Sequence, residues 1–346
     1  VELDDACIAN LKFILLCFEA VSGLKINFSK SEVLVTGVNY AEALRVARLL
    51  NCSLGSFTFK YLGLPISPFK LLAKDFAPAV TKVGNRVLPW RGRYNSQAGK
   101  VALTNSCLSS LPMFLMGFYL LSEGTHSGFD KHRGAFFWNS SDNKRKYRMV
   151  KWKFMCRPKN LGGLGIINTT FMNQCLMIKW WWKIMSGGDQ PLWFSILKAK
   201  YFPLSSPMFA NSRGGSQFWK ALVKVRPLFQ AHVKFVVGDG SSIRFWLDWW
   251  CGTTTLVVSF PVFFSYCPDP EISISKLSDN NWDLQLRRSL SPEELVDWQR
   301  HFALFHVLLE EEDSVVWPHF SSGHFSIKSL YAKLISGTPT TKFKLI

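Results

Sequence analysis

The chain has 346 residues, 48% of them hydrophobic, which is enough for a sizeable core and suggests two or three domains. Its eight cysteines are scattered without a CxxC pair, which argues against a disulfide framework or a zinc site and favours reduced thiols in an intracellular compartment. The net charge of +17 is concentrated in residues 82–160, which hold 15 Lys and Arg against three Asp and Glu. This block indicates a polyanion partner, with a solvated basic surface as the alternative.

The N-terminal residues have an α+β pattern. Apolar residues in segment 5–22 recur at helical spacing nearly all round, which predicts a buried helix that stops at Gly23. LKINF and EVLVT alternate like two short strands on either side of Ser29-Lys30. Residues 40–50 return to a helical pattern, and FTFKYLGLPI alternates as a strand does before it ends in a Gly/Pro turn.

Two carboxylates stand at the start of the first predicted helix and imitate a metal-binding motif. Two-metal phosphoryl transfer needs clustered carboxylates. Asp4 and Asp5 lack a preceding strand, however, and carboxylates favour a helix N-terminus. We therefore expect them to cap the helix, and we assign no catalytic residue to the chain.

After residue 70 the pattern is mostly helical. Asn168 or Thr169 is predicted to cap a long helix, and Trp182 is the tryptophan of the KWWWK segment that we expect to be buried. Three helices are marked by apolar residues at helical spacing: Phe76, Val80, Val83 and Val87; Phe129, Phe136 and Phe137; and Phe171, Cys175, Ile178, Trp182 and Met185.

Residues 101–122 contain no charged residue and so imitate a membrane span. Polar residues interrupt the segment and Pro112 splits it, while Leu103, Cys107 and Leu111 fall on one side of a helical wheel. This pattern predicts an amphipathic core helix, a break and an apolar element rather than a membrane helix.

From about residue 205 the chain is richer in Gly, Ser and Pro, and mixed α/β structure is predicted. VKFVVGDGSSIRFW has the pattern of a hairpin that turns at Asp239-Gly240. A helix is predicted over residues 291–309. The segment GHFSIKSLYAKLI is predicted to be a strand running into a short helix.

The segment RPKNLGGLG, residues 157–165, raises the question of a phosphate-binding loop. No strand precedes it, Pro158 interrupts the pattern, and neither a Walker lysine nor a later acidic residue accompanies the glycines. A nucleotide P-loop is therefore excluded, and a dinucleotide site has only weak support. The glycines are predicted to provide the turn into the helix that follows.

Basic and aromatic residues interleave densely in three stretches, RVLPWRGRYNSQAGK, NKRKYRMVKWKFMCRPK and KWWWK. Lys and Arg neutralise phosphates, while Trp and Tyr stack on bases. These stretches therefore point to nucleic acid as the polyanion.

Seven segments in chain order carry a family resemblance: GLKINFSKSE, FKYLGLPI, LPWRGRYNSQAGKVALTNSCLSSLP, VKWKFMCRPKNLGGLGIIN, NQCLMIKWWWKI, GDGSSIRFWLDWW and GHFSIKSLY. Together they resemble the C-terminal part of a plant LINE-type, non-LTR retrotransposon reverse transcriptase, over essentially the whole chain. The resemblance implies an α+β fold in three parts. These are a palm edge with a primer-grip-like hairpin (1–70), a basic helical thumb and linker (71–204), and a mixed region leading towards a truncated zinc-binding domain (205–346).

The parent enzyme implied by this resemblance is an intracellular, nuclear RNA-directed DNA polymerase that uses Mg²⁺. Its YADD-type aspartate motif has no match here, so we expect this fragment to be inactive alone and to hold no metal or cofactor. The residues expected to bind the RNA and DNA of a template–primer duplex are Lys30, Lys60, Tyr61, Gly63, Arg86, Trp90, Arg91, Arg93, Lys100, Arg157 and Lys159.

Two other readings compete with the polymerase fragment. The chain could be a non-enzymatic nucleic-acid-binding remnant or co-opted module, which shares the basic block but needs no upstream palm. It could also be a globular interaction protein whose basic face is incidental. Salt-dependent binding of duplex or hybrid separates the last reading from the other two.

Overall fold

The computed structural model describes residues 4–90, 96–138, 150–186, 191–203, 206–289, 291–293, 296, 311–320 and 322–337. The fold is α+β with a mostly helical body, as the sequence predicts. The chain forms two compact units, residues 1–76 and residues 77–346. The three-part division expected from the resemblance stays a prediction.

The first unit opens with α1 (Asp5–Ser22), which ends at Gly23 in the left-handed conformation with φ 70°, as predicted. The expectation that this helix is buried is wrong. Ile8 is buried, but Phe13, Ile14 and Phe18 are each more than half exposed. The described part of this small unit supplies too few side chains to surround a helix that is apolar nearly all round.

Acidic residues lie at the start of α1, but they do not cap it through their side chains. Asp4 occupies the N-cap position and makes no side-chain hydrogen bond there. The Asp5 carboxylate instead accepts a 2.6 Å hydrogen bond from Arg45 Nη1. Arg45 belongs to α2 (Tyr40–Leu49), which begins after the N-cap Asn39 and confirms the helix predicted there.

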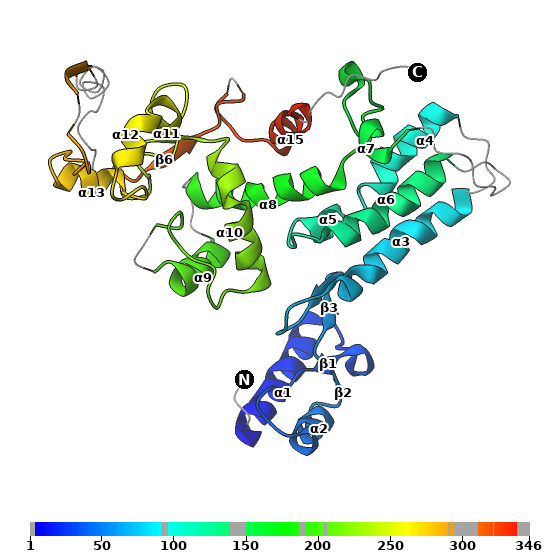
Figure 1. Ribbon diagram of the computed structural model, residues 1–346. Coiled ribbons are helices and arrows are strands. Elements are labelled where there is room, and N and C mark those ends of the chain that lie inside the picture. The colour runs from blue at the N-terminus through cyan, green and yellow to red at the C-terminus, as the bar shows by residue number, and fades with distance from the viewer. Residues whose placement is uncertain are drawn as a thin grey trace. The chain divides into compact units, whose positions relative to one another are not determined.

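The strands of the first unit are short (Figure 1). The strand predicted for LKINF is wrong, since Phe28–Lys30 forms a 3₁₀ turn, η1, whose Lys30 N–H donates to the Asn27 side chain. EVLVT contains β1 (Glu32–Val33), which pairs in parallel with β2 (Ser53–Leu54).

The FTFKYLGLPI segment folds into a two-stranded hairpin. Its strands β3 (Phe59–Tyr61) and β4 (Leu64–Ile66) pair antiparallel. Leu62 and Gly63 connect them with positive φ values of 49° and 86°, the backbone signs of a type I′ turn. The 3₁₀ turn η2 (Ala73–Phe76) follows the hairpin, and the likeness of this hairpin to a primer grip stays a prediction.

In the second unit, α3 (Ala77–Val87) packs along α6 (Glu123–Trp138) (Figure 1). Two glycines allow the close approach. A Cβ on Gly84 would lie 2.7 Å from the His132 ring, and one on Gly128 would lie 3.1 Å from Val80. The predicted helices here are confirmed.

The uncharged segment 101–122 has the predicted break. α4 (Gln97–Leu103) continues into a π-helical turn, η4 (Thr104–Leu108), and a short α5 (Met113–Met116) follows Pro112. Within the described part of the chain, no helix is both long and apolar enough to cross a membrane.

The long helix α8 (Thr169–Met185) organises the core, with α5, α10 (Gln217–Gln230) and α15 (Ile327–Ser336) packed against it. The Asn168 side chain caps it, as predicted. Of the three tryptophans in KWWWK, Trp181 and not Trp182 is fully buried, and its indole N–H donates to Leu222 O at 2.7 Å. The correction has a simple cause: α10 packs against the face that carries Trp181.

The hairpin predicted at Asp239-Gly240 is wrong. β5 (Lys234–Val236) pairs antiparallel with β6 (Ser314–Val316), far along the chain. The turn is held by the Asp313 carboxylate, which accepts hydrogen bonds of 2.7–2.9 Å from the backbone N–H groups of Gly238, Gly240 and Ser242. The turn is therefore stabilised by hydrogen bonds to a side chain far along the chain, and not by pairing with the strand that was predicted to follow it.

The remaining elements are short or lie near the chain's end. The strand predicted before α15 is absent from residues 322–326, whereas the helix is confirmed. The helix predicted over residues 291–309 lies almost wholly outside the described residues. The other elements are η3 (Leu88–Trp90), α7 (Trp152–Met155), η5 (Lys159–Leu161), α9 (Leu192–Tyr201), α11 (Leu256–Ser259), α12 (Pro261–Tyr266) and α13 (Ile274–Asp279).

The contact between α6 and α8 includes a buried histidine that should make stability depend on pH. His126 is 2% exposed, with its Nδ1 3.0 Å from Thr169 Oγ1. Burial lowers the pKa of His126 below 6.5 and nearby Arg133 lowers it further, although Glu123 and Asn173 act in the opposite direction. The unfolded chain therefore binds more protons, so the free energy of unfolding should fall as pH drops through about 6.5.

Urea unfolding at about pH 7.5 and about pH 5.5 tests this dependence. His126→Gln cannot be protonated in either state, so it should lose less stability between the two pH values than the wild type does. Equal losses in the two proteins would show that His126 does not carry the effect.

Candidate nucleic-acid interface

Basic residues from four segments gather around the C-terminal half of α6. We call this set the α6 basic surface. Its described members are Arg86, Trp90, Lys100, Lys151, Lys153, Arg157 and Lys159. Two further predicted residues, Arg91 and Arg93, lie outside the described residues.

The first side of the α6 basic surface comes from the end of α3 and the turn η3. The Arg86 guanidinium lies over the Trp90 ring, 5.6 Å from its centroid. The Trp90 ring in turn contacts Phe136 of α6, with a centroid distance of 5.6 Å. Arg86 is exposed and Trp90 half-buried, so the predicted cation and aromatic side chain form one unit on the surface.

Lys100 of α4 reaches the same end of α6. Its Nζ donates to the backbone oxygen of Phe137 at 3.3 Å. A cation near the last carbonyls of a helix is favourable because the helix dipole is negative there. The predicted contact residue Lys100 therefore has a structural partner, and its side chain is only partly exposed.

The second side is α7 and the loop after it. Lys153 Nζ and the Arg157 guanidinium both lie over the Phe154 ring, 5.3 and 4.6 Å from its centroid. Lys151, Lys153 and Lys159 are exposed. The segment is anchored under the surface by a small apolar cluster of Phe137, Met155, Cys156 and Ile166.

The glycines of RPKNLGGLG shape the loop, as predicted. Gly162 and Gly165 have φ values of 77° and 67°. Gly163 leaves no room for a side chain, since a Cβ there would lie 2.1 Å from the Arg157 carbonyl oxygen. Asn105 ties the end of the loop to the π-helical turn η4 by donating to Gly165 O and accepting from Ile167 N.

Among the described residues, no carboxylate forms an ion pair with the exposed members Arg86, Lys151, Lys153 and Lys159. Asp130 pairs instead with Arg133, whose side chain is fully buried. Arg133 also donates to Ile167 O, and burial lowers its pKa. The sequence counted Arg133 as part of the basic block, yet in the structure it joins α6 to Ile167, just after the RPKNLGGLG loop.

The predicted contact residues of the first unit lie on its surface. Lys30 is exposed in η1, and Lys60 and Tyr61 are exposed on β3. Gly63 forms the hairpin turn. Their positions suit a hairpin that presents a cation and an aromatic ring to solvent, and their role in binding stays a prediction.

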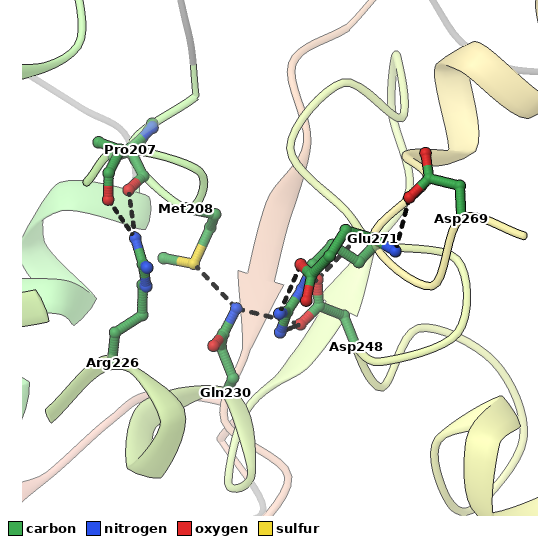
Figure 2. A network of polar contacts seen from close by, with 9 residues as sticks. Pro207, Met208, Arg226, Gln230, Asp248, Asp269 and Glu271 are labelled. Carbon is green, nitrogen blue, oxygen red and sulfur yellow. Dashed lines mark hydrogen bonds and ion pairs between the residues drawn. The ribbon is translucent and has the colours of Figure 1, made fainter. Parts of the chain in front are cut away.

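Two arginines that follow the basic block of residues 82–160 also have structural roles (Figure 2). Arg226 of α10 donates to Ala210 O at 2.7 Å. Arg244 pairs with the fully buried Asp248 and, at 3.1 Å, with Glu271. The Asp248 carboxylate also accepts from Gln230, as Figure 2 shows. Charge alone cannot separate such residues from those that bind a partner.

The described residues do not form a metal centre. No group there brings together three or more His, Cys, Asp or Glu side chains in a way that could hold a metal ion. A cavity of about 920 Å³ lies between the ends of α8 and α9 and the 239–242 turn, but lysines and carboxylates line it together.

Comparison with known proteins adds two relatives from Arabidopsis thaliana, although no protein-family model matches the chain. A protein described provisionally as a ribonuclease H protein is 26% identical over 289 residues, which are 78% of this chain and 44% of that protein. The chain thus spans less than half the length of this relative. An uncharacterized mitochondrial protein is 32% identical over 145 residues, 41% of this chain and 92% of that protein. Because the match covers nearly all of the mitochondrial protein at this identity, the chain belongs to the same protein family.

Proposed function

We propose that this chain is a nucleic-acid-binding part of a retrotransposon-related protein, and that it grips the backbone of a template–primer duplex. The observation that carries the proposal is the α6 basic surface, where the exposed cations Arg86 and Lys153 lie over aromatic rings and have no ion pair with a carboxylate among the described residues. Cations of this kind hold phosphates without reading sequence.

Two further observations support the finer assignment to a LINE-type, non-LTR reverse transcriptase. One relative is described as a ribonuclease H protein, a name that refers to nucleic-acid chemistry. The first unit contains an exposed hairpin at Lys60–Gly63, which is where the resemblance requires a primer-grip hairpin. A nuclear location of the parent enzyme belongs to the same proposal.

Mg²⁺ would belong to the parent polymerase and not to this chain. The Asp5 carboxylate is engaged by Arg45, which also pairs with Glu42 at 2.6 Å. A carboxylate held by a guanidinium is poorly placed to join a metal cluster, so Asp5 does not fit a catalytic magnesium site. The purified chain is accordingly expected to bind duplexes without extending a primer.

Equilibrium binding of a labelled RNA–DNA hybrid tests the proposal. Affinity should fall roughly 100-fold or more between about 50 and 200 mM salt, because several phosphate contacts each release counterions. Hybrids of unrelated sequence should bind alike, since backbone contacts carry no sequence information. No binding at the lower salt, or an affinity that salt leaves unchanged, would overturn the proposal in favour of an incidental basic face.

A further inference from the structure

A second basic region lies outside the α6 basic surface. The 48 residues from 191 to 238 contain seven Lys and Arg and no Asp or Glu. Two of the seven are only partly exposed: Arg226, which donates to the backbone oxygen of Ala210, and Lys234 on β5. Lys198 lines the cavity that also contains carboxylates. Four exposed cations remain: Lys200, Arg213, Lys220 and Lys224.

The four cations come from three segments that a stacked aromatic pair brings together. Tyr201, at the end of α9, stacks on Trp219 in the first turn of α10, with a centroid distance of 4.7 Å and an interplanar angle of 2°. The backbone N–H of Ser216 donates to the Tyr201 hydroxyl at 3.1 Å. Lys200 and Lys220 are the chain neighbours of the stacked rings, so the stack places them on adjoining segments.

The loop that carries Arg213 is fixed to the same pair. The Trp219 indole N–H donates to Asn211 O at 2.8 Å, and the Arg213 backbone N–H donates to the Asn211 side chain. Gly215 packs against the Trp219 ring so closely that a Cβ would lie 2.7 Å from it. Arg213 therefore projects from a constrained loop rather than from an open one.

None of the four cations is paired with a carboxylate in the part of the chain that the structure describes. Lys220 and Lys224 stand four residues apart on α10 and so share one face of that helix. The opposite face is buried through Trp219, Leu222 and Phe229. The exposed face of α10 thus carries two cations and no acidic side chain.

We infer that these residues form a second phosphate-binding surface for a nucleic-acid backbone, the α9–α10 surface, made of Lys200, Arg213, Lys220 and Lys224. The inference rests on the proposed function, which supplies the kind of partner. The proposed function favours nucleic acid over a lipid surface, and α10 exposes no large apolar side chain; α9 exposes Leu192 and Ile196, so binding to anionic vesicles is measured as the competing outcome. Trp219 stacks on both Tyr201 and Phe202, and Lys200 lies over the Tyr201 ring. These rings are therefore not available to stack on bases, and we expect phosphate contacts alone.

The test replaces Lys200, Arg213, Lys220 and Lys224 by Ala in the full chain and measures binding to duplexes of about 30 base pairs. Affinity should fall at least tenfold, and the slope of log affinity against log salt should become shallower by roughly 0.9 for each phosphate that is no longer neutralised. A variant with Lys200→Arg, Arg213→Lys, Lys220→Arg and Lys224→Arg keeps the charges and should bind like the wild type. Thermal unfolding checks that both variants are folded.

The outcomes separate this inference from the proposed function. If the wild type binds with salt dependence while the Ala variant keeps both affinity and slope, the α9–α10 surface is overturned and the α6 basic surface stands. If the wild type itself does not bind, both fail. If the Ala variant binds duplexes like the wild type but loses binding to anionic vesicles, the surface binds lipid and the inference is overturned.

Discussion

Hybrid binding should weaken by about 10³-fold when four exposed cations of the α6 basic surface are reversed together. Each charge-assisted hydrogen bond to phosphate contributes about 1 kcal/mol or more, and four of them give about 4 kcal/mol. The changes are Arg86→Glu, Lys151→Glu, Lys153→Glu and Lys159→Glu. All four side chains are exposed, so the fold should tolerate them. Fluorescence anisotropy at about 50 mM salt measures the weakening.

A matched variant controls for net charge. Lys276, Arg287, Lys328 and Lys333 are also exposed, and they belong to the part of the second unit that carries more acidic residues. Reversing these four to Glu changes the net charge equally but should lower affinity far less. Equal reductions in affinity for the two variants would mean that overall charge, not the α6 basic surface, governs binding.

Gly163→Ala should destabilise the second unit by about 3 kcal/mol, at the upper end of the cost of overpacking. A Cβ at this position would lie 2.1 Å from the Arg157 carbonyl oxygen and 2.5 Å from its carbon, both backbone atoms that cannot rotate away. The loop must therefore open and lose backbone hydrogen bonds. These include the bond from Gly163 N to Pro158 O at 3.0 Å and the bond from Gly165 N to Arg157 O at 2.9 Å. Urea unfolding measures the decrease in stability.

The neighbouring glycine is the control for this substitution. Gly162 has φ 77° and nothing within 4 Å of its would-be Cβ, so Gly162→Ala should cost only about 1 kcal/mol of backbone strain. Hybrid binding by Gly163→Ala should also weaken, because the loop displays Lys159. If the free energy of unfolding falls equally in both glycine variants, the close packing of Gly163 against Arg157 does not contribute to stability.

Local patterns predicted the helices well, because a run of apolar residues at helical spacing needs only nearby partners. They failed where a distant segment decides. The choice between Trp181 and Trp182 depends on where α10 packs, and the turn after β5 depends on Asp313. The burial of α1 was predicted wrongly because the apolar residues of a helix do not show whether other segments pack against them.

The candidate site could be predicted in part. Interleaved basic and aromatic residues pointed to Arg86 with Trp90 and to the 157–159 segment, and the structure brings these to one end of α6. Charge counting could not show that Arg133, Arg226 and Arg244 serve the core. It also did not single out Lys200, Arg213, Lys220 and Lys224, because their common location depends on the Tyr201–Trp219 stack.

The most direct test of the central claim is the slope of log affinity against log salt, measured for the wild type and for the four-site Glu variant of the α6 basic surface. This slope reports how many phosphates the protein neutralises and is insensitive to modest changes in fold stability. We predict a steep line for the wild type and one shallower by roughly 3 to 4 for the variant, at about 0.9 per phosphate left without its cation. Parallel lines, even with a lower affinity, would contradict the claim that these cations hold the nucleic-acid backbone.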